Sequence, residues 1–202
     1  MSGPCWLTGD DPVMTAYHDD EWGRPVVAEH ELYERLCLEG FQSGLSWRTV
    51  LSKRPAFREV FAGFDPEQVA SFGEDDVLRL LQDARIIRHR RKIEATINNA
   101  RAVLALHESG TLLRDLFWNY APAPKKARKP SVLADLPATT PEALELSKRL
   151  RKLGFAFVGP TTAYAAMQAC GIVNDHLTDC PFRADVERQR HEALATFTVK
   201  NA

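Results

Sequence analysis

Two cysteine–histidine pairs stand near opposite ends of the 202-residue chain. Cys5 and His18 form the first pair, and His176 and Cys180, four positions apart, form the second. Together they offer two thiolates and two imidazoles, the number and kind of ligands that a closed tetrahedral zinc site uses. Each residue could instead be a core thiol or a capping histidine, because the spacing of the first pair is not diagnostic. Both interpretations stay open at this point, and the spacing of the second pair would suit one turn of helix.

A metal held by both pairs would close a loop of most of the chain. Closing so long a loop takes the most entropy from the unfolded state, so the ion would act as a structural clip and not as a catalyst. Cys37 and Cys170, the other two cysteines, lie within apolar helical patterns. That position favours buried core thiols.

A second group of candidate residues surrounds Glu39. The block Leu36–Trp47 reads LCLEGFQSGLSW, and its glycines, Gly40 and Gly44, predict a turn that brings backbone close to a ligand. We expect Glu39 at the end of one helix and Trp47 one or two turns into the next. The plainer interpretation makes Trp47 a core aromatic and Glu39 a solvated charge.

A basic run, ARIIRHRRKI, follows at Ala84–Ile93. It contains no acid, and its cationic residues are Arg85, Arg88, Arg90, Arg91 and Lys92. The run lies where one helical pattern ends and the next begins, and helix N-terminal amides beside guanidinium groups form a phosphate site. A solvated basic turn is the other interpretation. The net charge of the chain is -1, so any affinity for nucleic acid must come from a local patch of this kind.

The composition is that of a globular protein without a membrane segment. Hydrophobic residues make up 45% of the chain and charged residues 26%, which is ample for a core. No stretch approaches the ~18 consecutive apolar residues of a membrane span. The N-terminus has no basic segment followed by an apolar run, so we expect no signal peptide and a cytoplasmic location. In that reducing compartment, cysteines indicate thiols or metal ligands more than disulfides.

The elements that position these residues are predicted to be helices. Within Lys92–Leu106, apolar residues recur at steps of three and four. Capping signals predict helix starts at Asp65–Pro66 and Thr140–Pro141, and the second of these helices should end before Gly154. No hairpin signal separates alternating strands, so the fold class is all-α. Further helices are expected at Ala28–Glu39, Leu45–Lys53, Glu74–Ala84, Leu112–Tyr120 and Pro160–Cys170.

Residues 1–202 are predicted to form a single domain, with two helical lobes around a cleft. The segment 121–131, APAPKKARKPS, is rich in proline and lysine and is typical of an exposed connection. The tail after Cys180 could form a short helix over Ala184–Thr198 or a frayed end.

Four segments in order along the chain resemble the type I 3-methyladenine DNA glycosylases, a bacterial family of the helix-hairpin-helix glycosylase superfamily. The similarity runs from about Cys5 to Cys180, and the segments are Tyr17–Pro25, Leu38–Trp47, Ile86–Ile93 and Gly154–His176. The resemblance implies a helix-hairpin-helix glycosylase fold. It also implies one structural zinc ion that joins the N- and C-terminal segments, with Cys5, His18, His176 and Cys180 as its ligands.

The resemblance further implies an activity. The enzyme flips N3-methyladenine out of alkylated double-stranded DNA and hydrolyses its bond to the sugar, releasing free 3-methyladenine. No lysine is placed as an obvious Schiff-base nucleophile, which favours a hydrolase without lyase activity. Glu39 would be the catalytic residue and would bind the base edge, with Trp47 stacked on the base and Tyr17 completing the pocket. A monomer is expected, and the implied DNA contacts are Gln42, Gly44, Leu45, Arg85, Arg88, Arg90 and Arg91.

Two positions depart from the family pattern. The family usually has glycine in place of Arg85 and often in place of Arg91, and a positive φ at either position would strain an arginine. Three other functions remain as alternatives: a broader alkylpurine glycosylase, a non-catalytic helix-hairpin-helix DNA-binding module, and a zinc-stapled protein-interaction domain. The presence of Tyr17, Glu39 and Trp47 together argues against the last two.

Overall fold

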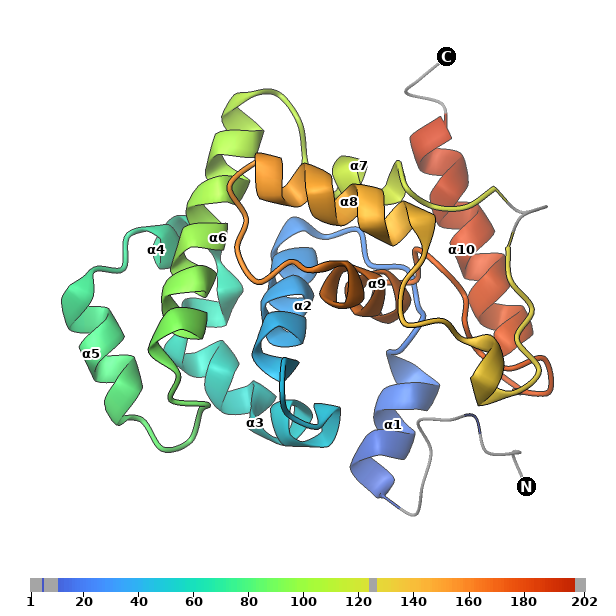
Figure 1. Cartoon of the computed structure of the whole chain (residues 1–202), viewed down its shortest axis with the longest axis horizontal. Coiled ribbons are helices and arrows are strands. Elements are labelled where there is room, and N and C mark those ends of the chain that lie inside the picture. Colours follow the sequence, from blue (N-terminus) through green and yellow to red (C-terminus); the bar gives the residue numbers. More distant parts are fainter. Residues whose placement is uncertain (1–4, 6–10, 124–126, 199–202) are drawn as a thin grey trace.

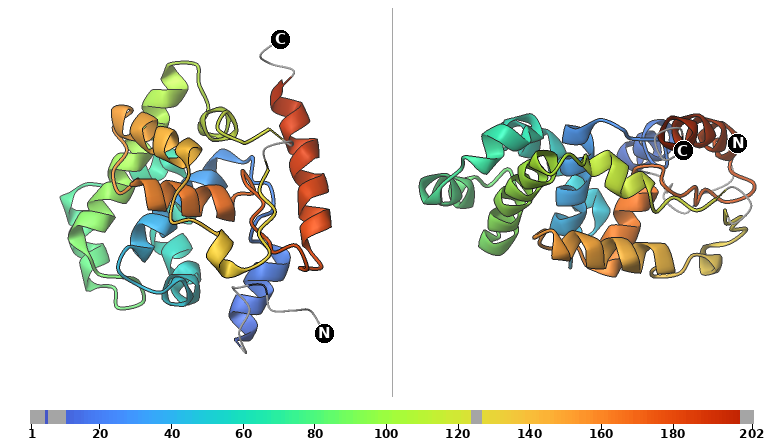
Figure 2. Two further views of the ribbon diagram at one scale, coloured as in Figure 1. Left: turned by 45° about the vertical axis from the view of Figure 1, so that its right-hand side comes forward. Right: turned by 90° about the horizontal axis from the view of Figure 1, so that it is seen from above.

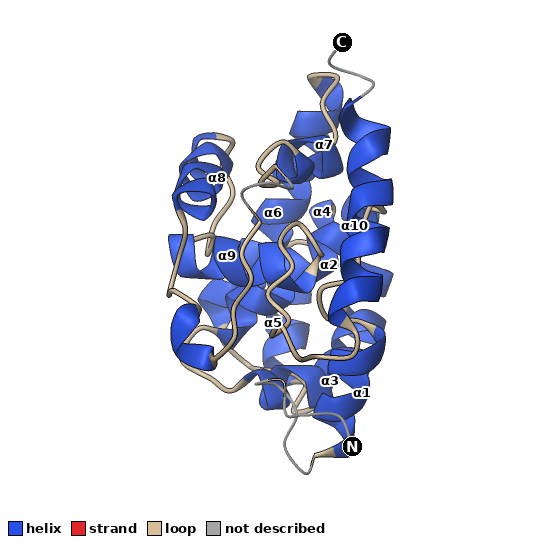
Figure 3. Cartoon of the chain, turned by 90° about the vertical axis from the view of Figure 1, so that its right-hand side faces the viewer, coloured by secondary structure: helices blue, strands red, loops and turns tan. Residues whose placement is uncertain are grey.

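The computed structural model describes residues 5, 11–123 and 127–198, and every regular element within them is a helix (Figure 3). The α-helices are α1 (Pro12–Asp20), α2 (Glu29–Gln42), α3 (Trp47–Val60), α4 (Pro66–Ala70), α5 (Glu74–Gln82), α6 (Arg90–Glu108), α7 (Leu113–Trp118), α8 (Pro141–Lys152), α9 (Pro160–Ala169) and α10 (Arg183–Thr198). Short 3₁₀ helices η1 (Ala62–Phe64) and η3 (Leu133–Asp135) join some of them. The predicted all-α class is confirmed. No described helix is long and apolar enough to cross a membrane.

Helix α2 lies at the centre of the molecule (Figure 1). It packs against α3, α6, α7 and α9, and nine of its 14 residues are buried. The ring of Phe41 lies 4.5 Å from that of Phe57, which joins the C-terminal part of α2 to α3. Because α2 is held on several sides, the residues at its C-terminal end have a fixed position.

Side-chain caps begin several helices. Asp65 Oδ1 accepts a hydrogen bond from Glu67 N at 2.9 Å and Thr140 Oγ1 accepts one from Ala143 N at 3.1 Å, as the capping signals predicted. Asp11 Oδ1 caps α1 in the same way, by accepting from Val13 N at 2.9 Å. The sequence patterns did not predict α1.

The helix boundaries near Glu39 differ from expectation. Helix α2 continues through Gly40 to Gln42, so Glu39 lies inside the helix. A Cβ atom on Gly40 would come within 3.4 Å of Phe157 Cβ, so the role of this glycine is close packing and not a turn. The expected turn is confined to residues 43–46, where Gly44 has φ of +80°.

Trp47 is the first residue of α3, and not one or two turns inside it as predicted. The reason is local, because Ser46 Oγ accepts a hydrogen bond from Thr49 N at 3.2 Å and fixes the start of the helix there. The indole therefore stands directly beside the turn that precedes it.

The tail after Cys180 is helix α10, which packs on the fold at the end of the molecule opposite α5 (Figure 2). Arg190 is fully buried and donates to Ile172 O at 2.9 Å and to Pro122 O at 2.6 Å. Phe197 stacks on Trp118 with ring centroids 5.3 Å apart. The helical alternative for the tail is therefore the one observed, and residues 199–202 lie outside the described part of the chain.

The connection over residues 121–131 is less exposed than predicted. Pro130 is buried, and its carbonyl accepts a hydrogen bond from Thr178 N at 2.8 Å. The carbonyl of Arg128 accepts one from Arg183 Nη2 at 2.6 Å. Both bonds attach the connection to the region around Cys180, whereas residues 124–126 of the predicted connection lie outside the described residues.

Candidate active site

Tyr17 on α1 and Trp47 on α3 meet in the structure. Their ring centroids are 5.3 Å apart, with an angle of 46° between the ring planes. Tyr17 is buried and Trp47 is partly buried. The indole Nε1 of Trp47 is buried and has no hydrogen-bond partner among the described residues. A buried N–H without a partner is uncommon, so this donor is available to a ligand.

Glu39 is only 6% exposed, and no hydrogen bond to its carboxyl group is recorded within the described part of the chain. Burial raises the pKa of Glu39 to about 8, against the opposing influence of the Arg35 guanidinium. Burial and then the nearby Glu39 charge raise the pKa of Tyr17. The burial of Glu39 contradicts the plainer interpretation of this residue as a solvated charge.

A surface cavity of about 380 Å³ adjoins Glu39. Its lining joins the end of α2 and the following turn to the N-terminal part of α9, and consists of Glu39, Gln42, Ser43, Gly44, Leu45, Thr161, Thr162 and Ala165. Tyr17 and Trp47 are outside this lining. The structure thus brings Glu39 together with Gln42, Gly44 and Leu45 around one cavity.

The α9 wall of the cavity was not among the predicted site residues. Gly159–Pro160 marks the start of a helix in the sequence, and α9 does begin at Pro160. Thr161 and Thr162 follow at once and present two hydroxyl groups beside Glu39's cavity. The sequence predicts this helix but contains no signal that its first turn faces Glu39.

The basic run forms the turn between α5 and α6, and two of its arginines already have acidic partners. Arg85 lies 2.8 Å from both Asp83 Oδ2 and Glu59 Oε2. Arg90 pairs with Glu74 at 2.8 Å and Glu94 at 3.2 Å. The prediction considered residues 84–93 alone, which contain no acid. Folding brings Glu59 and Glu74 from α3 and α5, whereas Asp83 and Glu94 flank the run in the sequence.

Arg88 lies on the same turn and Arg91 is the second residue of α6, and both are exposed. Neither Arg85 nor Arg91 has a positive φ, so the strain considered for an arginine at these positions does not occur. No side chain caps the N-terminus of α6, which leaves backbone N–H groups there for an anion.

Lys92 differs from the other cations of the run. Its side chain is buried, and Nζ donates to Phe41 O at 2.8 Å and to Ser43 O at 2.6 Å. We predicted phosphate binding for the whole basic run, Lys92 included, and for Lys92 that prediction is wrong, because its ammonium group is turned into the protein.

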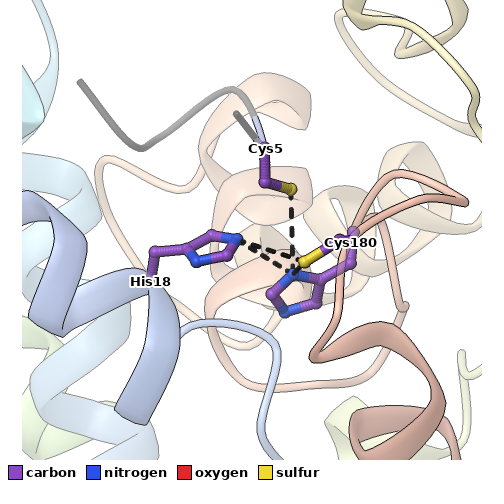
Figure 4. A group of neighbouring side chains, drawn as sticks. Cys5, His18 and Cys180 are labelled. Carbon is purple, nitrogen blue, oxygen red and sulfur yellow. Dashed lines mark hydrogen bonds between the residues drawn. The ribbon is translucent and has the colours of Figure 1, made fainter. Parts of the chain in front are cut away.

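The four terminal cysteine and histidine residues come together as a buried cluster, partly shown in Figure 4. Cys5 Sγ lies 3.8 Å from His176 Nδ1, and Cys180 Sγ lies 3.3 Å from that nitrogen and 3.7 Å from His18 Nε2. The two histidine nitrogens are 3.1 Å apart. Tetrahedral zinc, with bonds of about 2.0–2.3 Å, sets its nitrogen and sulfur ligands roughly 3.3–3.8 Å from one another. The donor set therefore fits a tetrahedral ion.

The histidine rings are oriented by further contacts. His18 Nδ1 is 2.6 Å from Asp19 Oδ1, and His176 Nε2 is 3.1 Å from Trp22 O. A carboxylate and a carbonyl only accept hydrogen bonds, so each contacted nitrogen carries the proton and the other one is left for a metal. The segment from His176 to Cys180 is a turn and not the predicted helical turn.

The remaining cysteines are core thiols, as expected. Cys37 and Cys170 are buried, and burial raises the pKa of each thiol to about 12. No disulfide occurs among the described residues.

Comparison with known proteins agrees with this geometry. The family model for methyladenine glycosylase matches residues 6–184. The chain is 48% identical to DNA-3-methyladenine glycosylase 1 of Escherichia coli K12 over 176 residues, which are 87% of this chain and 94% of that protein. It is 42% identical to DNA-3-methyladenine glycosylase of Haemophilus influenzae over 181 residues, 90% of this chain and 98% of the relative.

Solved structures give the same result. A crystal structure of 3-methyladenine DNA glycosylase I superposes with a TM-score of 0.85 at 47% identity, covering 89% of this chain and 98% of the other. A variant of such an enzyme in complex with 3-methyladenine superposes with a TM-score of 0.84 at 35% identity, covering 89% and 96%. The expected family is confirmed: this chain belongs to the methyladenine glycosylases and is an N-glycosylase, a hydrolase of N-glycosyl bonds.

Proposed function

We propose that the protein flips N3-methyladenine out of alkylated double-stranded DNA and hydrolyses its glycosidic bond, without lyase activity. The observation that carries the proposal is Glu39, a buried carboxyl group without a hydrogen-bond partner among the described residues, at the edge of a cavity. Relatives that act on 3-methyladenine, and a solved one that binds it, support the substrate.

The chemistry needs little from the protein because the substrate is already activated. Methylation at N3 makes the base cationic, and the electron pair of the broken N9–C1′ bond returns to the base, which leaves neutral. Water supplies the oxygen that bonds to C1′ and releases a proton to solvent. Glu39 stabilises the cationic base, and its carboxyl group becomes ionised when that positive charge enters the site. Trp47 stacks on the base and Nε1 is available as a donor.

Selectivity follows from the same charge. A buried carboxylate opposite a cationic base gains a charge-assisted hydrogen bond, whereas normal adenine offers no positive charge in return for its desolvation. No aspartate lines the Glu39 cavity within the described residues, so no aspartate is assigned a role. Tyr17 and Trp47 are assigned to the site as a pair of rings in contact with each other, although they lie outside the lining of that cavity.

The DNA is held by two turns, the one between α2 and α3 and the one between α5 and α6. Gln42 and Leu45 are proposed to fill the space that the extruded nucleotide leaves, and Leu45 is suited to this because its apolar side chain is 42% exposed. Arg88 and Arg91 beside the uncapped start of α6 are proposed to bind backbone phosphates in the manner of a helix-hairpin-helix. Arg85 and Arg90 would contribute less, because carboxylates already neutralise them.

One structural zinc ion is proposed for the cluster of Cys5, His18, His176 and Cys180. Bound there, the ion would supply no catalysis and would fasten α1, which carries Tyr17, to the segment that follows α9. All of these groups belong to one chain, so the proposal requires only a monomer with its cleft between two helical lobes.

Binding of free 3-methyladenine tests the pocket. The base should quench the tryptophan fluorescence of the wild type, while Trp47→Ala should weaken binding by roughly 10- to 100-fold through lost stacking. Glu39→Gln should weaken it as well. Trp118→Phe is the control, because it removes an indole from the core beside Val26 and not from the pocket. Wild-type affinity in both pocket variants would place the base elsewhere.

The broader alkylpurine glycosylase remains the second candidate. The Glu39 cavity is open to the surface, and most of its polar lining consists of small side chains. The relative rates of N3-methyladenine and N7-methylguanine release distinguish the two activities.

A further inference from the structure

Among the cationic side chains of residues 85–92, that of Lys92 is the one buried in the described structure. It is 7% exposed, and Nζ lies 2.8 Å from Phe41 O and 2.6 Å from Ser43 O. The cavity beside it measures only about 10 Å³, so no phosphate fits there. Charge-assisted hydrogen bonds of this length are strong, which indicates a built contact and not a lysine in search of solvent.

The two carbonyls belong to the end of α2 and flank Gln42. The last carbonyls of a helix have no intrahelical partner, and a cation near them also interacts favourably with the helix dipole. Helix α2 has no basic residue in its own last turn. Lys92 supplies that missing cation from α6, and so fixes the backbone on both sides of Gln42.

The turn that Lys92 holds has few other constraints. Leu45 N donates to Gln42 O at 2.6 Å, but Ser43, Gly44 and Leu45 are all exposed, and nothing lies within 4 Å of a Cβ atom placed on Gly44. Without Lys92, the residues proposed to enter the DNA would be attached mainly through the end of α2 and the capped start of α3.

At its other end, Lys92 directly follows Arg91 in the first turn of α6. A second lysine makes a related link, since Lys53 Nζ on α3 donates to Ala84 O at 3.2 Å and to Arg85 O at 2.9 Å. The α5–α6 turn is therefore attached to the end of α2 through Lys92 and to α3 through Lys53.

We propose that Lys92 is a positioning residue that couples phosphate binding by the α5–α6 turn to insertion of the Gln42–Leu45 turn into the duplex. The inference rests on the proposed function of both turns. Burial lowers the pKa of Lys92, in agreement with an ammonium group removed from solvent. Docking of Arg88 and Arg91 on the backbone would thus determine where Gln42 and Leu45 meet the base stack.

The test uses Lys92→Met, which keeps the length of the side chain and removes its donors. Lys148→Met is the matched control, because Lys148 is 60% exposed and, among the described residues, its ammonium group pairs with Glu145 alone. Insertion is read from 2-aminopurine placed next to a tetrahydrofuran abasic analogue in a duplex, which requires no excision. Losing two charge-assisted bonds should reduce insertion and single-turnover release of 3-methyladenine by about 10- to 100-fold.

Two further readouts separate positioning from other roles. Free 3-methyladenine should bind Lys92→Met within about twofold of the wild type, and the salt dependence of DNA binding should not change, because Lys92 touches no phosphate. A salt slope lowered by about one unit, unimpaired insertion, or an equal loss of base binding would each overturn the proposal.

If Lys92→Met does not fold, Lys92→Arg provides the test instead. Arginine retains a cation that can donate to both carbonyls, so it should restore part of the insertion signal while base binding stays normal. If the wild type inserts into the duplex but releases no 3-methyladenine, the proposed activity is refuted and the coupling is not. If Lys92→Met releases 3-methyladenine normally, the coupling is refuted and the proposed activity is not.

Discussion

Glu39→Gln should stabilise the protein, and increasingly so as the pH rises. Glu39 is buried with a pKa near 8, against an unperturbed value of 4.5. Between these values the folded state holds a proton that the unfolded state has lost, so the wild type loses stability as pH rises. At about 1.36 kcal/mol per pH unit, the cost is roughly 3 kcal/mol at pH 7 and approaches 5 kcal/mol above pH 8. Glutamine has the same shape and no such cost.

The assay is urea unfolding of both metal-loaded proteins at several pH values from 5.5 to 8.5. Ligand protonation makes metal binding pH-dependent, but that contribution is common to both proteins, so the difference between their unfolding free energies isolates Glu39. The difference should grow by about 3 kcal/mol from pH 5.5 to 8 and then level off.

Glu34→Gln is the matched control on the same helix. Glu34 is 5% exposed, as buried as Glu39, but its two oxygens accept from Arg58 Nε at 2.9 and 3.0 Å. Since Arg58 is half-exposed, losing this pair should destabilise the protein by roughly 1–2 kcal/mol. The two substitutions should therefore act in opposite directions. A Glu39→Gln protein no more stable than the wild type at pH 8 would refute the view of Glu39 as a buried acid kept for its substrate.

Three other outcomes follow from the structure. Protein purified without added metal should contain about one zinc per chain by elemental analysis, and chelation or Cys180→Ser should lower the Tm by about 10 °C or more; equal melting of metal-free and metal-loaded protein would contradict the structural clip. Neutralising Arg88 and Arg91 should reduce the salt slope of DNA binding by about two units, and more than neutralising the ion-paired Arg85 does; a slope unchanged by both changes would make this a solvated turn. Arg190→Met should cost about 2–4 kcal/mol in urea unfolding while base binding stays normal, and a loss below ~0.5 kcal/mol would mean that α10 adds little to the fold.

Local signals predicted much of the helical framework. Asp65 and Thr140 cap their helices as the sequence indicated, because a cap involves residues two or three positions apart and needs no tertiary context. The apolar stripe of Lys92–Leu106 likewise predicted most of α6. Helix α1 was missed because it is short and has no clear apolar stripe, and the burial of Tyr17 and His18 depends on contacts from elsewhere in the chain.

For the candidate site, the sequence singled out residues whose roles stay predictions, and it did not predict their environment. The burial of Glu39 arises from α2 being covered by several helices, and the partners Glu59 and Glu74 reach the arginines of the α5–α6 turn only after folding. The inward orientation of the Lys92 side chain also depends on tertiary packing. Successive residues of a helix point about 100° apart, so one member of a basic run can be buried while its neighbour Arg91 is exposed.

The most direct test of the proposed activity is base release from duplex DNA that carries both N3-methyladenine and N7-methylguanine, followed chromatographically with strand breaks measured in parallel. The wild-type protein should release 3-methyladenine in preference to 7-methylguanine and leave the abasic strands intact. No release of 3-methyladenine would contradict the proposed activity. Equal release of both bases would show the broader alkylpurine glycosylase instead, and enzyme-dependent strand cleavage would contradict hydrolysis without lyase activity.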